Sequence, residues 1–222
     1  ANTGNINMDR NAIADGSLDY VYWSTPVAGF DVNNITPLST RVYSWSPTTA
    51  SGYISDFGNW AVATGGMTNG LGYIVGGSAG NTTFTGVPNN GDITTPISRS
   101  TYIGVAYTGP TTTQVTADDD NWNLLGNPYP SAINAVDFLV ANSANLNQWV
   151  KIWTHNIDPA AIADPFYQDF QLNYSTADYI TYNALGGTQE GFDGYIGAAQ
   201  GFFVLMNDAN STSENAVFNN TM

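Results

Sequence analysis

The chain of 222 residues has no cysteine, one histidine (His155) and one lysine (Lys151). The lack of cysteine excludes disulfides, thiolate nucleophiles and cysteine metal sites. A lone histidine, with no Gly-x-Ser-x-Gly turn elsewhere, gives no basis for a serine–histidine–aspartate triad. None of the glycine-rich turns lies between a strand and a helix with a following lysine, so a phosphate loop is also excluded.

Charge is scarce and of one sign. Only 10% of the residues are charged, and 18 acidic residues against four basic ones give a net charge of −14. Such a chain repels nucleic acid and anionic lipid, so neither is an expected partner. No apolar run reaches membrane-spanning length, and we expect no direct membrane insertion. No export signal stands at the first residue, and we expect that any such signal has been removed or lies outside this sequence.

Short alternating apolar runs bounded by Gly, Asn, Pro or Asp recur along the chain, whereas helical periodicity is nearly missing. This pattern predicts an all-β fold, an antiparallel β-sandwich of the jelly-roll kind. The predicted strands are residues 19–23, 41–45, 60–63, 72–75, 82–85, 101–107, 122–125, 150–154, 178–182 and 201–206. Residues 131–141, opened by Ser131, predict one short helix.

A weak internal duplication divides the chain into residues 1–112 and 113–222. The order of the matching segments is preserved, although insertions around 142–147 and 156–169 lengthen the second half. The matches are 23–26 with 125–128, 41–45 with 151–154, 72–75 with 201–204, and 83–85 with 217–219. The halves form either one continuous sandwich or two tandem units. We favour one unit, because the linker at 109–120 is short and flanked by strands.

Five landmarks lie in order along nearly the whole chain: YWSTPV (22–27), GYIV (72–75), TFTGVPNNGDI (83–93), WNLLGNPYPSAI (122–133) and QGFFV (200–204). Together they resemble a recurrent region of large surface and secreted proteins of the Bacteroidetes lineage. Those proteins leave the cell through type IX secretion, with a C-terminal sorting domain downstream. The sequence ends without such a domain, so we expect it to be a fragment or processed product of a longer protein.

The resemblance implies a location outside the cell or on its surface, and a structural, adhesive or assembly role. It carries over no catalytic residues. Our expectation is therefore a non-enzymatic structural or adhesive module that contacts other copies or neighbouring domains of its parent protein and is able to assemble into a filament. The alternative is a carbohydrate-binding module attached to a secreted enzyme.

The run Asp118, Asp119 and Asp120, followed by Asn121 and Asn123, is the best candidate for a metal site. Clustered carboxylate and amide oxygens suit Ca²⁺, although the glycine and distal glutamate of a helix-loop-helix calcium loop are missing. A solvated turn before the strand at 122–125 explains the same residues. No other cofactor is expected.

Aromatic residues near the insertion are candidates for stacking on sugar rings. We single out Trp149, Trp153 and Tyr167 as ligand-binding residues, with glycans as their partners. Each of these aromatic residues could equally be present because it packs in the core of the sandwich, since Tyr and Trp also favour strands. Glu190 and Asp193 could be read as a glycosidase pair, but neither lies in a recognisable motif, and an acidic turn is the better interpretation.

Overall fold

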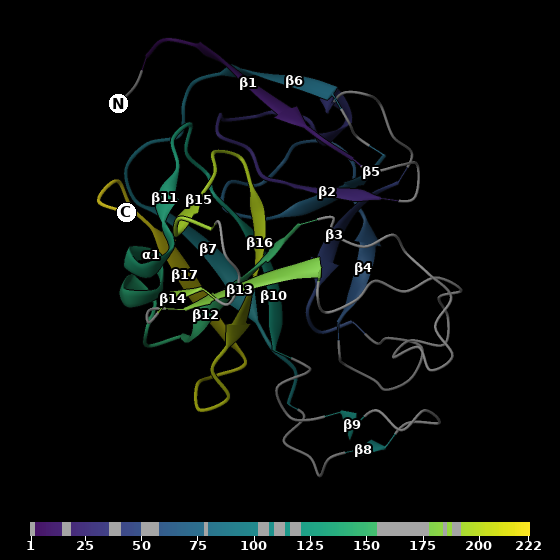
Figure 1. Cartoon of the computed structure of the whole chain (residues 1–222), viewed down its shortest axis with the longest axis vertical. Coiled ribbons are helices and arrows are strands. Elements are labelled where there is room, and N and C mark those ends of the chain that lie inside the picture. The colour runs from purple at the N-terminus through teal and green to yellow at the C-terminus, as the bar shows by residue number, and fades with distance from the viewer. Residues whose placement is uncertain are drawn as a thin grey trace.

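The structure is a computed structural model. It describes residues 3–14, 19–35, 41–49, 58–77, 80–101, 107–108, 114–115, 121–154, 178–183, 186–187 and 192–222. Within them the chain is all-β, with antiparallel sheets and one α-helix, which confirms the predicted fold class (Figure 1). No helix in these ranges is long and apolar enough to cross a membrane.

The first half of the chain builds a four-stranded sheet in the order β2-β5-β3-β4. Its strands are β2 (Tyr20–Trp23), β3 (Val42–Ser46), β4 (Asn59–Val62) and β5 (Tyr73–Gly76). β2 and β5 consist almost entirely of aromatic and β-branched residues, which favour a pleated strand. Both strands are nearly fully buried, because side chains cover the two faces of this part of the sheet.

The second half builds the matching sheet, in the order β10-β16-β12-β13-β14. Its strands are β10 (Trp122–Gly126), β12 (Leu146–Trp153), β13 (Tyr179–Asn183), β14 (Gly186–Gly187) and β16 (Gly201–Met206). β16 lies between β10 and β12 and is buried along its whole length. Its apolar side chains therefore serve two different clusters, one on each face of the sheet.

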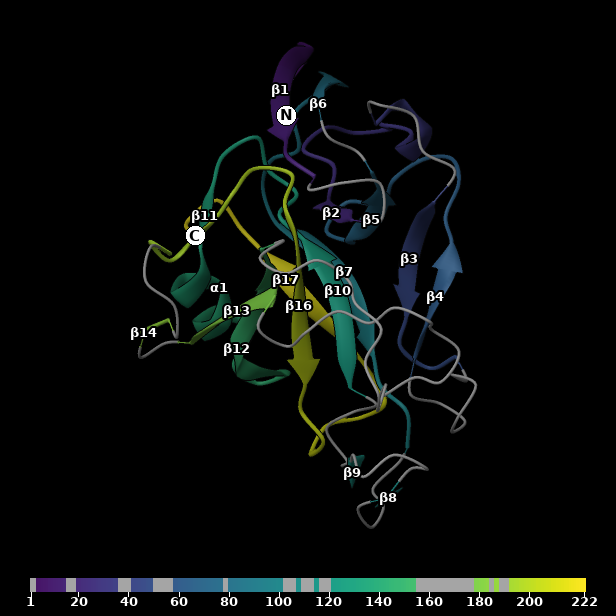
Figure 2. The same ribbon diagram turned by 45° about the vertical axis from the view of Figure 1, so that its right-hand side comes forward.

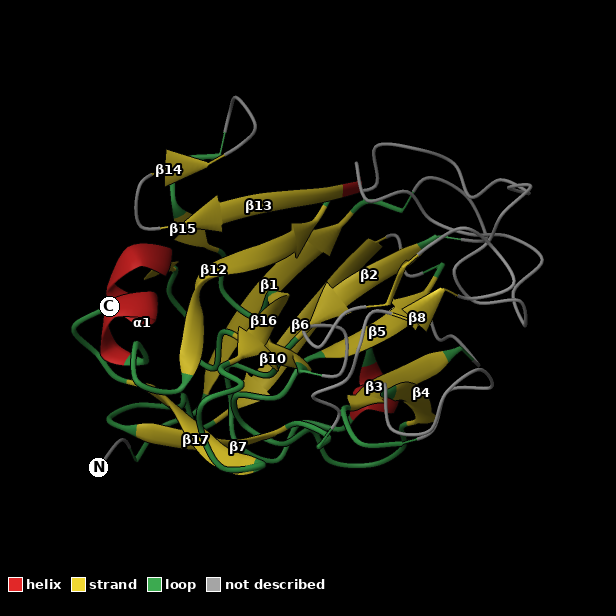
Figure 3. Ribbon diagram, turned by 90° about the horizontal axis from the view of Figure 1, so that it is seen from below, coloured by secondary structure: helices red, strands yellow, loops and turns green. Residues whose placement is uncertain are grey.

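Two-stranded ribbons cover one face of each sheet. The first pairs β1 (Ile6–Ala12) with β6 (Gly80–Gly86), and the second pairs β7 (Ile93–Ser98) with β17 (Ser213–Phe218). Figure 3 shows the β7–β17 ribbon packed beneath β10 and β16. Two shorter pairs are β8 (Tyr107–Thr108) with β9 (Gln114–Val115), and β11 (Ile133–Asn134) with β15 (Tyr195–Ile196).

The two sheets have the same strand order under the equivalence that the sequence duplication predicts. β2, β5 and β3 correspond to β10, β16 and β12, and β6 corresponds to β17. Isolated bridges join Trp23 to Gln200 and Leu71 to Leu125, and these two bridges are also equivalent. The halves are therefore joined by the same contact made twice.

Each sheet has its own apolar core, between the sheet and its ribbon; the second ribbon contains β7 from residues 1–112, so the second core includes side chains of both halves. The first core contains Trp23, Val75 and Phe84, all nearly inaccessible to solvent. The second contains Phe138, Phe202 and Phe218, likewise buried. Leu71 packs against both cores, so the two are continuous at the junction of the halves.

The helix α1 (Ala135–Ala141) begins four residues later than Ser131, where the sequence predicts its start. Ile133 and Asn134 pair with β15 instead. The Asn134 side chain then accepts hydrogen bonds from the N–H groups of Val136 and Asp137, at 2.9 and 3.2 Å, and so caps the helix. A 3-10 turn, Val32–Asn34, lies in the first half.

Candidate functional site

Aromatic side chains from both sheets meet and form a third apolar cluster. We call it the aromatic cluster; its rings are Tyr20, Tyr22, Tyr43, Trp45, Trp60, Trp122, Trp149, Trp153, Tyr179 and Phe203. Figure 2 shows β3 and β4 of the first sheet beside β10 and β16 of the second, which is where these side chains gather. The duplication thus brings together rings that are distant in sequence.

Phe203 is the centre of the cluster. Its ring centroid lies 5.6 Å from that of Trp45, 6.0 Å from that of Trp60 and 5.9 Å from that of Trp122, in edge-to-face geometry. The Trp45 indole N–H also donates to the carbonyl of Trp122 at 2.8 Å, which ties β3 to β10. Edge-to-face pairs of this kind are stabilised by about 0.5–1.5 kcal/mol beyond simple burial, so each pair helps to fix the arrangement of the rings.

Trp153, one of the predicted ligand residues, packs inside this cluster. Its ring stacks on that of Tyr22, with centroids 5.6 Å apart and planes within 7°, and only 7% of the residue is exposed. The Tyr22 hydroxyl is hydrogen-bonded to that of Tyr179 at 2.7 Å. The faces of Trp153 are therefore engaged in packing between the two halves.

Trp149 lies at the more open end of the cluster and is only partly buried. Its ring meets that of Trp122 edge to face at 5.1 Å. The ammonium group of Lys151 lies over both indoles, 4.9 Å from the Trp122 centroid and 5.3 Å from the Trp149 centroid. Since successive strand residues alternate faces, β12 presents Trp149, Lys151 and Trp153 on the same side. Tyr167, the third predicted ligand residue, lies outside the described residues.

The four basic residues fall into two groups. Arg10 donates to the carbonyls of Tyr22 and Ala199, at 2.9 and 2.5 Å, and burial lowers its pKa to about 10. Arg99 is 8% exposed and donates to the carbonyls of Ser100, Asp208 and Asn210. The other two lie over rings of the aromatic cluster: Lys151 as above, and Arg41 4.9 Å from the Tyr20 centroid. Arg10 also lies over a ring, 4.2 Å from the Trp23 centroid, in the first core. The aromatic cluster thus holds two of the four basic side chains.

The predicted ion site at Asp118, Asp119 and Asp120 lies outside the described residues. Asn121, which follows it, is fully buried and donates to the Asp208 carboxylate at 2.7 Å. Among the residues that the structure describes, no group of three or more histidine, cysteine, aspartate or glutamate side chains could hold a metal. Asp193 accepts from the N–H of Tyr195 at 3.0 Å, as in a turn; Glu190 and His155 are outside the described ranges.

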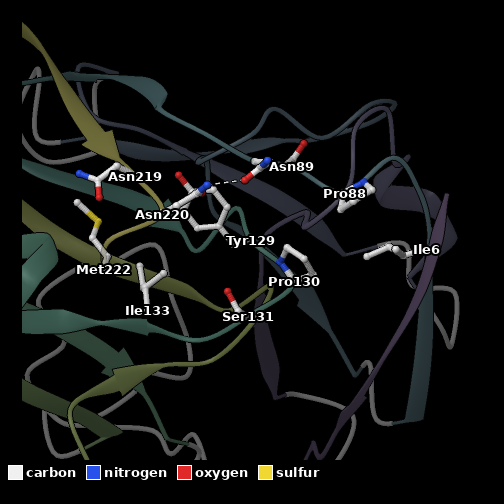
Figure 4. Close-up of a pocket in the computed structure, with 11 residues that line it drawn as sticks. Ile6, Pro88, Asn89, Tyr129, Pro130, Ser131, Ile133, Asn219, Asn220 and Met222 are labelled. Carbon is white, nitrogen blue, oxygen red and sulfur yellow. Dashed lines mark hydrogen bonds between the residues drawn. The ribbon is translucent and has the colours of Figure 1, made fainter. Parts of the chain in front are cut away.

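A pocket of about 390 Å³ lies where the two longest sequence landmarks meet (Figure 4). The turns after β6 and β10 form its middle, with Ile6 at one end and Met222 at the other. None of its lining residues has a charged side chain: Ile6, Pro88, Asn89, Asn90, Tyr129, Pro130, Ser131, Ile133, Asn219, Asn220 and Met222. The sequence singles out residues 83–93 and 122–133 as landmarks, but only the structure shows that they share one cavity.

Hydrogen bonds fix the walls of this pocket. The Asn89 side chain donates to the carbonyls of Thr25 and Pro128, at 3.1 and 3.0 Å, and so connects equivalent turns of the two halves. The Tyr129 hydroxyl donates to the carbonyl of Gly91 at 2.6 Å. Burial, with a smaller contribution from Asp92, raises the pKa of Tyr129 to about 12. The hydroxyl therefore stays protonated at neutral pH.

Comparisons with known proteins assign the chain to a family but not to an activity. A family model described as a domain of unknown function, DUF8693, matches residues 1–222. No curated protein and no solved structure matches the chain.

Proposed function

The chain belongs to the DUF8693 family, and we propose that it is a non-enzymatic adhesive module of a secreted or cell-surface bacterial protein. The observation that carries this proposal is the aromatic cluster. Seven of its rings, Tyr20, Tyr43, Trp45, Trp60, Trp122, Trp149 and Tyr179, keep part of their surface in contact with solvent. Partly exposed aromatic groups on a rigid support are typical of contact surfaces.

The chemistry of the cluster suits adhesion better than catalysis. Its polar groups are indole N–H groups, tyrosine hydroxyls, Lys151 and Arg41, and the described side chains that form it include no carboxylate pair such as glycoside hydrolysis needs. Tyr and Trp supply a large contact area with few rotatable bonds, so little conformational entropy is lost on binding.

The alternative, a carbohydrate-binding module, is favoured by one specific feature. Trp122 and Trp149 form a pair of partly exposed indoles at one end of the cluster, with Lys151 beside both. Indole faces stack on the apolar faces of sugars, and a nearby ammonium group can donate to hydroxyls or carboxylates.

The test uses fluorescent beads coated with the protein. Beads are mixed with insoluble polysaccharide particles of cellulose or chitin, or with a second set of beads that carry the same protein. Trp122→Ala and Trp149→Ala are expected to lower adhesion at least tenfold. The matched control is Tyr195→Ala, because Tyr195 is an exposed aromatic residue (51%) outside the cluster. Adhesion to polysaccharide alone would favour the alternative; unchanged adhesion of both tryptophan variants would contradict the proposal.

We also propose that copies of the chain associate with one another, with calcium as a bridging ion for the acidic surface. Among the described residues, β4 pairs only with β3, and Val62 on β4 is 74% exposed. An edge strand of this kind can add a strand from another copy. Light scattering at high protein concentration, with and without Ca²⁺, tests this; a strict monomer in both conditions would contradict it.

A further inference from the structure

We propose that the pocket between the two landmark turns binds an uncharged saccharide. This site shares no residue with the aromatic cluster and does not depend on the adhesive role. Its volume of about 390 Å³ lies in the range of small-molecule sites. A single sugar ring or a disaccharide end is the ligand size that fits.

The absence of charged side chains in the lining disfavours charged ligands. The chain carries 18 acidic residues, yet none of the eleven lining residues has a charged side chain. A charged ligand would lose hydration without gaining an ionic partner, which is costly. The site therefore favours a ligand whose polar groups are neutral hydroxyls or amides.

The lining offers both kinds of contact that a sugar needs. Within the described structure, the amide N–H₂ groups of Asn90 and Asn219 and the hydroxyl of Ser131 make no hydrogen bond to protein, so they are available to donate to sugar oxygens. The partly or fully exposed side chains of Ile6, Pro88, Pro130 and Met222 supply the apolar surface against which the C–H groups of a sugar ring can pack, whereas Tyr129 and Ile133 lie buried behind them.

The backbone of the pocket argues against an extended peptide as the ligand. Pro88 and Pro130 have no N–H to donate. The N–H of Asn89 is bonded to the carbonyl of Pro26 at 3.0 Å, and that of Gly91 to the Asn220 side chain at 3.1 Å. Strand addition needs a row of unused backbone groups, and these walls lack it.

The pocket is also held in its shape without a ligand. The Asn69 side chain donates to Asn89 at 3.0 Å, and Asn89 in turn holds the turns at Thr25 and Pro128. The amide N–H₂ of Asn220 donates to the side-chain oxygen of Asn90 across the lining. Because these hydrogen bonds already hold the pocket walls in place, ligand binding orders few protein groups and little conformational entropy is lost.

The test is a titration of protein labelled at the methionine methyl groups, followed by NMR. The probes are glucose, galactose, mannose, N-acetylglucosamine and their β-linked disaccharides, with glucuronate and a proline-containing tripeptide as comparisons. At least one neutral sugar is expected to shift the Met222 methyl signal, while Met67 and Met206, buried in the two cores, stay unchanged. No shift with any neutral sugar, or a shift only with glucuronate or the tripeptide, would overturn the proposal.

A blocking variant confirms the location. Ser131→Phe fills the pocket but removes no hydrogen bond that the Ser131 side chain makes to the described protein, since that residue accepts only through its backbone carbonyl. It is expected to weaken sugar binding at least tenfold, whereas Ser143→Phe, at an exposed position after α1, leaves it unchanged. Trp149→Ala is also expected to leave it unchanged, which separates this site from the adhesive surface. Equal binding by Ser131→Phe, verified as folded by circular dichroism, would contradict the assignment.

Discussion

Gly70 and Ala199 occupy equivalent positions in the two halves and share a left-handed backbone, with φ of +81° and +58°. The carbonyl of each accepts a bond from the turn of the other half: Gly126 N–H donates to Gly70 at 2.9 Å, and Ser24 N–H donates to Ala199 at 2.6 Å. Among the described residues other than glycine, only Ala199 has positive φ. The junction between the halves therefore imposes this conformation, whichever residue is present.

Gly70→Ala is expected to destabilise the fold by about 3–5 kcal/mol, since strain and overpacking add. A methyl group there would lie 1.9 Å from the Thr95 hydroxyl and would also need an unfavourable φ. The measurement is urea unfolding followed by tryptophan fluorescence.

A control variant separates the effect of the unfavourable φ angle from that of the steric clash with Thr95. Gly91 has φ of +79°, but an added methyl group there would meet nothing within 4 Å. Gly91→Ala is therefore expected to cost only about 1–2 kcal/mol. Equal losses for the two variants would show that the contact with Thr95 is unimportant.

Arg10 is expected to hold the first ribbon onto both halves. Arg10→Met leaves the carbonyls of Tyr22 and Ala199 without this donor and removes a guanidinium that lies 4.2 Å from the Trp23 ring centroid. We expect a loss of about 2–4 kcal/mol in the free energy of unfolding. Hydrogen exchange should accelerate first in β1 and β6. If Arg41→Met, which removes a guanidinium from the aromatic cluster, has the same effect on this ribbon, the assignment is wrong.

Asn89 is expected to contribute more stability than any neighbouring polar side chain of its turn. Asn89→Ala leaves the carbonyls of Thr25 and Pro128 without this donor, so about 2–4 kcal/mol should be lost. Asn90→Ala, at the adjacent exposed position, should cost less than about 1 kcal/mol. Thermal unfolding of the two variants measures the difference, and a larger loss for Asn90→Ala would contradict the interpretation.

Strand positions could be predicted where aromatic and β-branched residues concentrate, as in β2, β5 and β16. Each predicted strand overlaps an observed one; for 101–107 the overlap with β8 is Tyr107 alone, and 102–106 lie outside the described residues. β1, β7 and β17 were missed. Their outward faces carry Asn, Asp, Thr or Glu, and β7 contains Pro96. These residues have low strand propensity, so the local sequence does not predict strands there. Pairing with a partner strand in a ribbon stabilises them nevertheless.

The candidate sites could be predicted only in part, because both depend on how the halves are placed together. The sequence alone singles out Trp149 and Trp153. It does not show that Trp153 packs against Tyr22, which is 131 positions away in the chain. The pocket residues stand out as turn formers, and nothing local shows that Pro88 and Pro130 line the same cavity. Contacts between the two halves of a duplicated chain cannot be predicted from the sequence of either half alone.

Tyr129 provides a test through pH. Its pKa in the folded state is raised to about 12, above the ordinary value of 10, because burial disfavours the phenolate. The unfolded chain therefore loses this proton first, and the stability contributed by neutral Tyr129 is complete below pH 10 and is lost as pH rises towards 12. Tyr129→Phe removes the bond to the Gly91 carbonyl and should cost about 1 kcal/mol at pH 7. Because phenylalanine does not titrate, its free energy of unfolding should fall less steeply than that of the wild type between pH 10 and 12. Parallel curves for the two proteins over this interval would mean that Tyr129 titrates normally and that its hydroxyl is not held in the wall of the pocket.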